Sequence, residues 1–542
     1  MSHDDHTAGA AQDPAAVERL ANEVPGVREA VALVDRRLRP AGRRARRSEP
    51  SSPLGRGTPL PTRGKALSIG PEHRSPDDLP ERSSTLIEAL LRATAEAPER
   101  GITYVLPDGS TDRQTYPELL DDGLRLLAGL RDIGLVEGDP VLLQCGDNRT
   151  FLTAFWACLL GGFLPTPVGV APSTRSSAAS GRLYAAWRLL GRPPVLADDE
   201  ALDRVRSLGA DWEEGEDLRV FSVRGLTRQD PAEPAAVHPD RPVLNLLTSG
   251  STGVPKCVRH PSRTLLARSY ATVLANGFTE HEVSLNWMPL DHVGGLVMYH
   301  LRDVVLGCEQ VSAPTESFVR RPLNWLDWID RFGVTNTWAP NFAFALVTKL
   351  GAEIGEGRWD LSSLRHICNG GEPVTVATAH RFLELLEPHG LPADAMVPSW
   401  GMSETSSGVT FSRLDGRDHS VGTVTLDPRS LDGPLHTLPH GTAGALTLTD
   451  LGPPIAGVRL RVVDAEGEIL PEGRVGRLQI SGSTLMPGYF GNPEANRESM
   501  LPDGWFDTGD LGFLHEGRLV LTGRTKDMVI VNGANYPAHD VE

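Results

Sequence analysis

Hydrophobic and polar positions alternate between helical and strand periods from about residue 85 onward. Residues 84–99, "STLIEALLRATAEAPE", have helical spacing behind a Ser/Thr cap, and residues 119–135 repeat that spacing up to Gly134. Residues 102–110, "ITYVLPDGS", predict a strand and a turn, and residues 139–145, "DPVLLQC", predict a buried strand. This alternation is typical of layered α/β architecture with largely parallel sheets.

An uncharged stretch, residues 151–171, is long enough to suggest a membrane span. Its central Gly-Gly pair and its two prolines would interrupt a spanning helix. We therefore expect a buried helix, a stop at the glycines and then a buried strand.

The N-terminal part differs in composition from the rest of the chain. Residues 15–35, "AAVERLANEVPGVREAVALVD", predict a short amphipathic helix and an apolar strand. The next segment, "RRLRPAGRRARR" (36–47), precedes a stretch rich in Pro, Ser and Gly, as in a solvated linker. The arginines also suit docking on an acidic partner domain, but a solvated basic segment is the simpler interpretation. The sequence thus predicts an extension and linker over residues 1–80 and a folded core from residue 81.

Length, charge and cysteine content narrow the class of protein. A chain of 542 residues allows at least two structural units and a sizeable core. The net charge of -17 argues against nucleic acid or an anionic membrane as a general partner, because both need a positive surface. The cysteines show no paired short spacing, so neither a zinc site nor a disulfide framework is indicated. The acidic, polar N-terminus does not have the pattern of a signal peptide, and we expect a cytoplasmic protein.

Residues 247–256, "LTSGSTGVPK", have the chemistry of a phosphate-binding loop. Small residues let backbone N–H groups approach phosphate oxygens, hydroxyls add donors, and Lys256 supplies a cation. The loop is not the P-loop of common nucleotide hydrolases, because Pro255 precedes the lysine and Cys257 follows it. Taken alone, the segment fits a plain Ser/Gly-rich turn equally well.

Six further motifs follow this loop. They are "WMPLDHVGGLVM" (287–298), "NGGEPV" (369–374), "SWGMSET" (399–405), "GYFGNP" (488–493), "GWFDTGDLG" (504–512) and "GRTKDMVIVNGANYP" (523–537). In this order, the motifs resemble those of the adenylate-forming superfamily of acyl-CoA synthetases, luciferases, fatty acyl-AMP ligases and nonribosomal peptide synthetase adenylation domains. "SSGVTFS" and "NGANYPAHDVE" are similar to fatty acyl-AMP ligase-like loading domains of polyketide and hybrid synthases.

The resemblance implies a fold and a division of the chain. Residues 81–522 would form an α/β adenylation core with two parallel-rich β-sheets flanked by helices, plus a distorted β-barrel. Residues 523–542 would be the hinge and the start of a truncated C-terminal domain, so the family's second catalytic lysine would lie beyond Glu542. We expect such a chain to bind nucleotide better than it turns it over. Residues 15–35 are themselves similar to a helix and strand of that C-terminal domain.

The resemblance also implies a reaction. Members of the family use ATP and Mg²⁺ to activate a carboxylic acid as an acyl-adenylate and then transfer the acyl group to a thiol. Here it favours the phosphopantetheine thiol of an acyl or peptidyl carrier protein in the same parent polypeptide, with loading of a starter unit as the expected role. Bringing a carboxylate onto the α-phosphorus requires cations, oriented donors and exclusion of water.

Residues for the phosphates and the metal are carried over from the matching motifs. Lys256 would act as a catalytic cation. Glu404 matches the magnesium ligand, a hard carboxylate for a hard cation. Ser403 stands where the family usually has a threonine that contacts the α-phosphate. The loop residues that would wrap the β- and γ-phosphates are Thr248, Ser249, Gly250, Ser251, Thr252 and Gly253.

Residues for the base, the ribose and the hinge follow from the later motifs. Trp400 matches an aromatic residue near adenine. Asp510 matches the carboxylate that accepts both ribose hydroxyls, and Arg524 matches an arginine that contacts ribose or phosphate. Lys526 falls at the hinge between the two domains. The other residues expected around the base are Gly370, Gly371, Glu372, Pro373 and Gly401.

The residues leave the identity of the acid open. By resemblance, residues 287–298 line the acyl pocket, where His292 matches a catalytic histidine of many acyl-activating members. Gly294 and Gly295 would leave space beyond it. Asp291 lies where amino-acid-activating members pair an aspartate with the substrate ammonium. Asn369 joins the same substrate set.

We expect activation of a non-amino acid that is short, hydroxylated or aromatic. Amino-acid activation, acid-CoA ligation and a catalytically silent docking module are the alternatives.

Overall fold

The structure, a computed structural model, describes residues 57–60, 64–71, 83–170, 178–248, 255–525, 528–531 and 534–537. The chain divides into two units, Met1–Pro53 and Leu54–Glu542, and the described residues all belong to the second. The predicted loop residues Ser249 to Gly253, the predicted hinge residue Lys526 and the elements expected in residues 15–35 lie outside the described residues.

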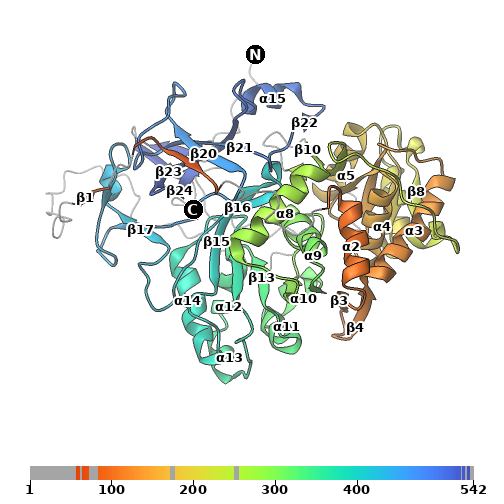
Figure 1. Ribbon diagram of the computed structural model, residues 1–542, viewed down its shortest axis with the longest axis horizontal. Helices are drawn as coiled ribbons and strands as arrows, with labels where there is room; N and C mark the ends of the chain where they lie inside the picture. The colour runs from red at the N-terminus through yellow and green to blue at the C-terminus, as the bar shows by residue number, and fades with distance from the viewer. Residues whose placement is uncertain are drawn as a thin grey trace, which may run out of the picture. The chain divides into compact units, whose positions relative to one another are not determined.

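Eight strands form one mostly parallel sheet (Figure 1), in the order β16-β15-β14-β13-β11-β12-β3-β4. Neighbours from β15 to β3 run parallel, and the edge strands β4 and β16 are antiparallel to theirs. This arrangement confirms the first parallel-rich sheet. The strands are β3 (Gly101–Val105), β4 (Thr111–Thr115), β11 (Val283–Asn286), β12 (Glu309–Ser312), β13 (Asn336–Ala339), β14 (His366–Asn369), β15 (Met396–Met402) and β16 (Ser407–Phe411).

Four strands form a second sheet in the order β6-β5-β7-β8, and all its neighbours run parallel. The predicted split of residues 151–171 is confirmed, because α4 ends at a glycine and a fully buried strand follows. No helix among the described residues is both long enough and apolar enough to cross a membrane. The elements are β5 (Pro140–Gln144), α4 (Asn148–Leu160), β6 (Leu164–Pro167), β7 (Val195–Ala197) and β8 (Val220–Ser222).

The antiparallel part, expected as a distorted barrel, consists of two sheets linked by a bridge between Asp450 and Val520. Their orders are β2-β20-β21-β23-β24 and β1-β18-β17-β19. The strands are β1 (Thr58–Pro59), β2 (Leu67–Ile69), β17 (Thr423–Leu426), β18 (His436–Thr437), β19 (Leu446–Thr449), β20 (Val458–Val463), β21 (Gly476–Gly482), β23 (Phe506–His515) and β24 (Arg518–Arg524). β1 and β2 come from the segment predicted as a linker, so the core sheets begin before residue 81. Strands this short produce no alternating pattern that the sequence could reveal.

Two small sheets complete the β-structure. One has the order β22-β10-β9 and joins two of the sequence motifs. The other is an antiparallel hairpin near the end of the chain. The strands are β9 (Pro242–Thr248), β10 (Lys256–Pro261), β22 (Tyr489–Phe490), β25 (Met528–Val531) and β26 (Ala534–Pro537).

Local signals set the ends of the first helices. The side chain of Thr85 caps α2 (Leu86–Glu96), and Thr115 and Glu118 form a capping box at the start of α3 (Tyr116–Asp132). The α3 helix ends just before Gly134, which has φ +87°, as the sequence predicts. The remaining helices are α5 (Ala178–Leu189), α6 (Asp199–Gly209), α7 (Val223–Leu226), α8 (Ser262–Asn276), α9 (Arg302–Leu306), α10 (Thr315–Arg320), α11 (Asn324–Phe332), α12 (Asn341–Thr348), α13 (Gly351–Glu356), α14 (Val376–Leu386) and α15 (Pro493–Ser499). A π-helical segment, η4 (Gly294–Leu301), and the 3₁₀ turns η3 (Gly215–Asp217), η5 (Glu387–His389), η6 (Ser403–Thr405) and η7 (Pro428–Ser430) add to these.

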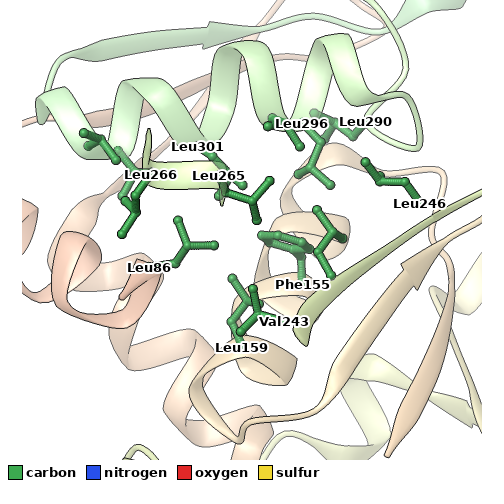
Figure 2. Packing of buried hydrophobic residues seen from close by; sticks show 14 of the residues in the cluster. Leu86, Phe155, Leu159, Val243, Leu246, Leu265, Leu266, Leu290, Leu296 and Leu301 are labelled. Atoms are coloured by element: carbon green, nitrogen blue, oxygen red, sulfur yellow. The ribbon is translucent and has the colours of Figure 1, made fainter. Parts of the chain in front are cut away.

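Two hydrophobic clusters hold the layers together. Figure 2 shows part of the first, in which Leu86 of α2, Phe155 of α4, Leu246 of β9, Leu265 of α8 and Leu296 of η4 share one core. The second joins α11, α12 and α14 to strands β11 and β14. Burying a side chain of this size stabilises the fold by about 1.5–3 kcal/mol, so these cores keep the strand ends that carry the motifs in place.

Candidate active site

Two predicted nucleotide-site segments lie at the ends of neighbouring parallel strands. β14 ends at Asn369, with Gly370 and Gly371 directly after it, and Trp400 lies near the end of β15. A Cβ atom on Gly370 would lie 2.7 Å from the backbone oxygen of Ser399 on β15. Gly371 has φ +86°. Both positions therefore favour glycine, one for close approach and one for its backbone conformation.

A strained turn follows β15 and presents Glu404. Ser406 and Ser407, directly after η6, have φ of +61° and +106°, a region that residues with side chains rarely occupy. A Cβ atom on Gly401 would lie 2.0 Å from the backbone oxygen of Ser407, so β15 and β16 are very close there. Such conformations cost on the order of 1–3 kcal/mol each and persist where the surrounding structure enforces them.

Glu404, the predicted magnesium ligand, is buried beside Tyr489, whose ring also contacts Lys256. It is 6% exposed, and its Oε1 accepts a hydrogen bond of 2.7 Å from the Tyr489 hydroxyl. The ring of Tyr489 lies 4.8 Å from Nζ of Lys256, which is a cation–π contact. Burial and the charge of Glu404 both raise the pKa of Tyr489, so its hydroxyl stays protonated and donates.

Sheet pairing brings Lys256 and Tyr489 together from distant motifs. Thr248 is the last residue of β9 and Lys256 is the first residue of β10, and the two are paired. They therefore stand at the two ends of the predicted phosphate loop. On its other edge β10 pairs with β22, which places Val258 opposite Tyr489. The sequence shows Tyr489 within "GYFGNP" but assigns it no role, because its contact with Glu404 depends on this pairing.

His260, which no motif singles out, holds the backbone of Ser403. Its Nε2 lies 2.7 Å from the carbonyl oxygen of Ser403, so Nε2 carries the proton and donates it. Its Nδ1 lies 3.1 Å from the Thr264 hydroxyl and 3.3 Å from the Ser406 hydroxyl. Burial lowers the pKa of His260 to about 4, and the imidazole is neutral at pH 7.

Asp510, the predicted ribose ligand, is held on both carboxylate oxygens. Its Oδ2 accepts a hydrogen bond of 2.8 Å from Nε1 of Trp400, and its Oδ1 accepts one of 2.9 Å from Nε of Arg524. Asp510 and Arg524 are opposite each other in the β23–β24 pairing. Trp400, expected near the base, is 7% exposed and belongs to the first hydrophobic cluster. Its indole N–H group donates to the carboxylate of Asp510.

The predicted acid-binding segment is more tightly packed than expected. Asp291 is half-buried and His292 is exposed. A Cβ atom on Gly294 would lie 2.1 Å from the indole ring of Trp338, and one on Gly295 would lie 2.6 Å from a backbone oxygen. The expectation that these two glycines leave open space is therefore wrong. Gly294 has no room for a side chain because the ring of Trp338 packs against it, and Gly295 has none because the backbone of Pro289 does.

The remaining predicted residues lie at the edge of the site. Asn369 is fully buried, and neither atom of its amide has a hydrogen-bond partner among the described residues. Glu372 and Pro373 are exposed, and Glu372 accepts a hydrogen bond from the backbone N–H of Phe342. This segment therefore forms an open rim after β14.

A family comparison decides the class of the protein. A model of the family described as AMP-binding enzyme matches residues 91–490, which is more than half of the chain. The chain belongs to the AMP-binding enzyme family. It is an adenylate-forming ligase with the adenylation-domain fold that the resemblance implies.

Solved structures similar to this AMP-binding enzyme include nonribosomal peptide synthetase (NRPS) adenylation domains. The adenylation domain of a keto acid-selecting NRPS module bound to keto acyl adenylate is 46% identical, with a TM-score of 0.83 over 88% of this chain and 86% of that one. McyG A-PCP complexed with phenylalanyl-adenylate is 38% identical, with a TM-score of 0.79 over 88% of this chain and 70% of that one.

A curated relative belongs to a longer protein. Atromentin synthetase nps3 of Serpula lacrymans var. lacrymans (strain S7.9) is 30% identical over 479 residues, which are 84% of this chain and 46% of the relative. The chain thus spans about half the length of the curated relatives it matches.

The predicted closeness to fatty acyl-AMP ligases is weaker than expected. Fatty acyl-adenylate ligases from E. coli and L. pneumophila are 26% identical to this AMP-binding enzyme, with a TM-score of 0.77 over 85% of this chain and 83% of that one. That identity is well below the 46% shared with the keto acid-selecting domain. The comparisons therefore favour the NRPS adenylation branch.

Glu404 gives the AMP-binding enzyme a donor suited to Mg²⁺. This ion usually keeps several waters and takes one or two carboxylates together with substrate phosphates. Within the described ranges, no group of three or more His, Cys, Asp or Glu side chains could hold a metal ion by itself. The Tyr489 hydroxyl donates to Oε1 of Glu404, and no other side-chain hydrogen bond or ion pair to this carboxylate is formed among the described residues. Glu404 thus fits a metal shared with a nucleotide.

Proposed function

We propose that this enzyme activates an α-keto acid with ATP to form a keto acyl-adenylate, and then passes the acyl group to the phosphopantetheine thiol of a carrier protein. One observation carries the proposal. The chain is 46% identical over 88% of its length to an adenylation domain that selects a keto acid and binds a keto acyl adenylate. Identity at that level, together with a TM-score of 0.83, supports a similar substrate class.

Buried Glu404 and half-buried Lys256 suit the phosphate side of this reaction. An oxygen of the acid's carboxylate attacks the α-phosphorus, and the bond to the bridging oxygen breaks as pyrophosphate leaves with the electron pair. Lys256 offsets the charge on the phosphates, with Thr248, Ser403 and the predicted loop as donors. Mg²⁺ bound to Glu404 would supply charge neutralisation on the departing pyrophosphate. The site needs these groups because two anions must meet.

The ribose side orients the nucleotide. Asp510 would accept hydrogen bonds from ribose hydroxyls, with Arg524 and Trp400 holding its carboxylate in place. These residues act before the chemical step, by fixing the position of the α-phosphorus.

Amino-acid activation is the second candidate. Asp291 has the residue type that pairs with a substrate ammonium, and the McyG structure, at 38% identity, contains phenylalanyl-adenylate. Asp291 is only half-buried, so it does not need such a partner to avoid an uncompensated buried charge.

A pyrophosphate-exchange assay with four acids of one carbon skeleton separates the candidates. Leucine, its α-keto analogue, its α-hydroxy analogue and the unsubstituted acid differ only at the α-position. We expect the keto acid to give the fastest exchange, by about tenfold or more, a ratio typical of a recognised polar group. Fastest exchange with leucine, lost in Asp291→Ala, would establish the amino-acid alternative. If no acid supports exchange and ATP with Mg²⁺ gives no calorimetric signal, the chain is a silent docking module.

A further inference from the structure

Tyr489 lies between the two opposite charges of the phosphate side. Its hydroxyl donates to Glu404 at 2.7 Å, and its ring lies 4.8 Å from Nζ of Lys256. The described part of the chain contains no ion pair between Lys256 and Glu404, although both contact this one side chain. An ammonium and a carboxylate attract each other more strongly where less water surrounds them, and Glu404 is buried.

The segment around Tyr489 fixes the backbone of this residue. The side-chain amide of Asn496 accepts a hydrogen bond of 2.7 Å from the backbone N–H of Tyr489 and donates one of 2.9 Å to its carbonyl oxygen. Asn496 is itself positioned by α15, whose first turn is capped by the side chain of Asn492. The pairing of β22 with β10 fixes the other side. These contacts hold the backbone of Tyr489, and the hydrogen bond to Glu404 holds the end of its side chain.

We propose that Tyr489 is a positioning residue that keeps Lys256 and Glu404 from neutralising each other. The hydroxyl holds one oxygen of Glu404, and the ring face gives the ammonium a partner that leaves its charge intact. Lys256 then stays available to phosphate oxygens, and Glu404 stays available to Mg²⁺. This inference rests on the roles that the proposed function gives to Lys256 and Glu404.

The proposal makes the effect of Glu404 on ATP binding depend on Tyr489. In Tyr489→Leu the ring and the hydroxyl are both lost, and Lys256 can pair directly with Glu404. Removing the charge of Glu404 in that variant would release Lys256 to the phosphates. In the parent chain no ion pair joins Lys256 to Glu404 among the described residues, so the same change would release nothing.

Calorimetric titration of ATP in metal-free buffer tests this dependence in the parent chain, Tyr489→Leu, Glu404→Gln and the double variant. We expect Tyr489→Leu to weaken ATP binding about tenfold. We also expect Glu404→Gln to tighten binding about tenfold more in the Tyr489→Leu background than in the parent, a coupling typical of contacting residues. If Glu404→Gln has the same effect in both backgrounds, Tyr489 only packs and the proposal fails.

Tyr489→Phe provides a second test that does not depend on the Leu variant folding. It keeps the ring and loses only the hydroxyl, so metal-free ATP affinity should stay within about twofold while the gain on adding Mg²⁺ falls about tenfold. A Phe variant equal to the parent in both titrations would overturn the proposal. Tyr104→Phe is the matched control, because Tyr104 is also buried and donates at 2.7 Å to Gln114.

The two proposals can fail separately. The titrations contain no acid, so they give the same answer whichever acid is the substrate. A parent chain that binds ATP but exchanges fastest with an amino acid would reject the α-keto acid and leave the role of Tyr489 intact.

Discussion

Glu404 and Asp510 are both buried carboxylates held by an aromatic donor, but they are engaged to different extents. Among the described residues, Glu404 accepts one side-chain hydrogen bond, from Tyr489, and Lys256 contacts the ring of the same tyrosine. Asp510 receives a hydrogen bond on each oxygen, one from an indole and one from a guanidinium. A carboxylate with an unengaged oxygen can take a cation, whereas one already paired with arginine is suited to neutral hydroxyl donors. The difference matches a metal at one end of the nucleotide and a ribose at the other.

The difference between the two carboxylates is tested most directly by a variant that removes the charge of Glu404 and keeps its shape. We expect Glu404→Gln to slow pyrophosphate exchange about a hundredfold, as for other groups that stabilise charge in the transition state. Exchange over a range of Mg²⁺ concentrations is the measurement, and the rate should recover little at high Mg²⁺. Glu472→Gln is the control, because Glu472 is also buried but accepts from the backbone of Gly517. Equal slowing in both variants would contradict a special role for Glu404.

The turn that presents Glu404 should also be sensitive to acid. The pKa of His260 is about 4 in the folded chain and about 6.5 when unfolded. Between these values the unfolded chain binds a proton that the folded chain does not, so stability falls as the pH is lowered from 6.5 toward 4. From pH 7 to pH 5 this single group would cost about 2 kcal/mol.

Urea unfolding of the parent chain and His260→Gln at both pH values measures that cost. Glutamine can still donate to the Ser403 carbonyl but gains no proton, so the variant should lose about 2 kcal/mol less on acidification. The quantity to compare is the change in unfolding free energy between the two pH values, parent chain against variant. Burial also holds the pKa of His300 at about 4, and because His300 is present in both chains its contribution cancels. An identical pH dependence in both chains would show that His260 does not titrate as inferred.

Much of the fold follows from local sequence signals. The helix after Thr85 and the helix that stops before Gly134 were predictable because caps and periodicity act within a few residues. The strands β1 and β2 were not, since each has at most three residues and exists only through its partner strand. Short edge strands owe their existence to tertiary pairing, and a sequence pattern carries little of it.

The residues of the candidate site also fall into two groups, those that a sequence motif reveals and those whose contacts depend on tertiary pairing. Lys256, Glu404 and Asp510 lie in motifs, and the sequence singles them out as candidates. Tyr489 was passed over, because its contacts with Glu404 and Lys256 depend on the β22–β10 pairing. Gly294 was misinterpreted, because a glycine does not reveal whether its missing side chain leaves space or admits a neighbour, and here Trp338 fills the position.

On the ribose side, we predict that changing Asp510 impairs recognition of the sugar. We expect Asp510→Asn to weaken ATP binding about tenfold, because a charged acceptor of the hydroxyls is lost and Arg524 is left unpaired. The preference for ATP over dATP should also fall in this variant. Calorimetric titration with both nucleotides measures that preference. Asp427→Asn is a matched control, since Asp427 is also buried and paired with an arginine, Arg429. An unchanged preference would remove Asp510 from the ribose site.

The smallest expected effect comes from the indole N–H of Trp400. In Trp400→Phe the aromatic ring remains, but Oδ2 of Asp510 loses the hydrogen bond from the indole while Arg524 still donates to Oδ1. Losing this hydrogen bond should hold the carboxylate less firmly, and we expect about a threefold loss in the preference for ATP over dATP. Trp187→Phe is the control, because Trp187 is also fully buried and its Nε1 has no partner in the described residues. If Trp400→Phe weakens ATP and dATP equally, Trp400 acts through the base, as the family resemblance implies. If only the preference changes, the indole acts through Asp510, and the two carboxylates differ in how many donors orient them.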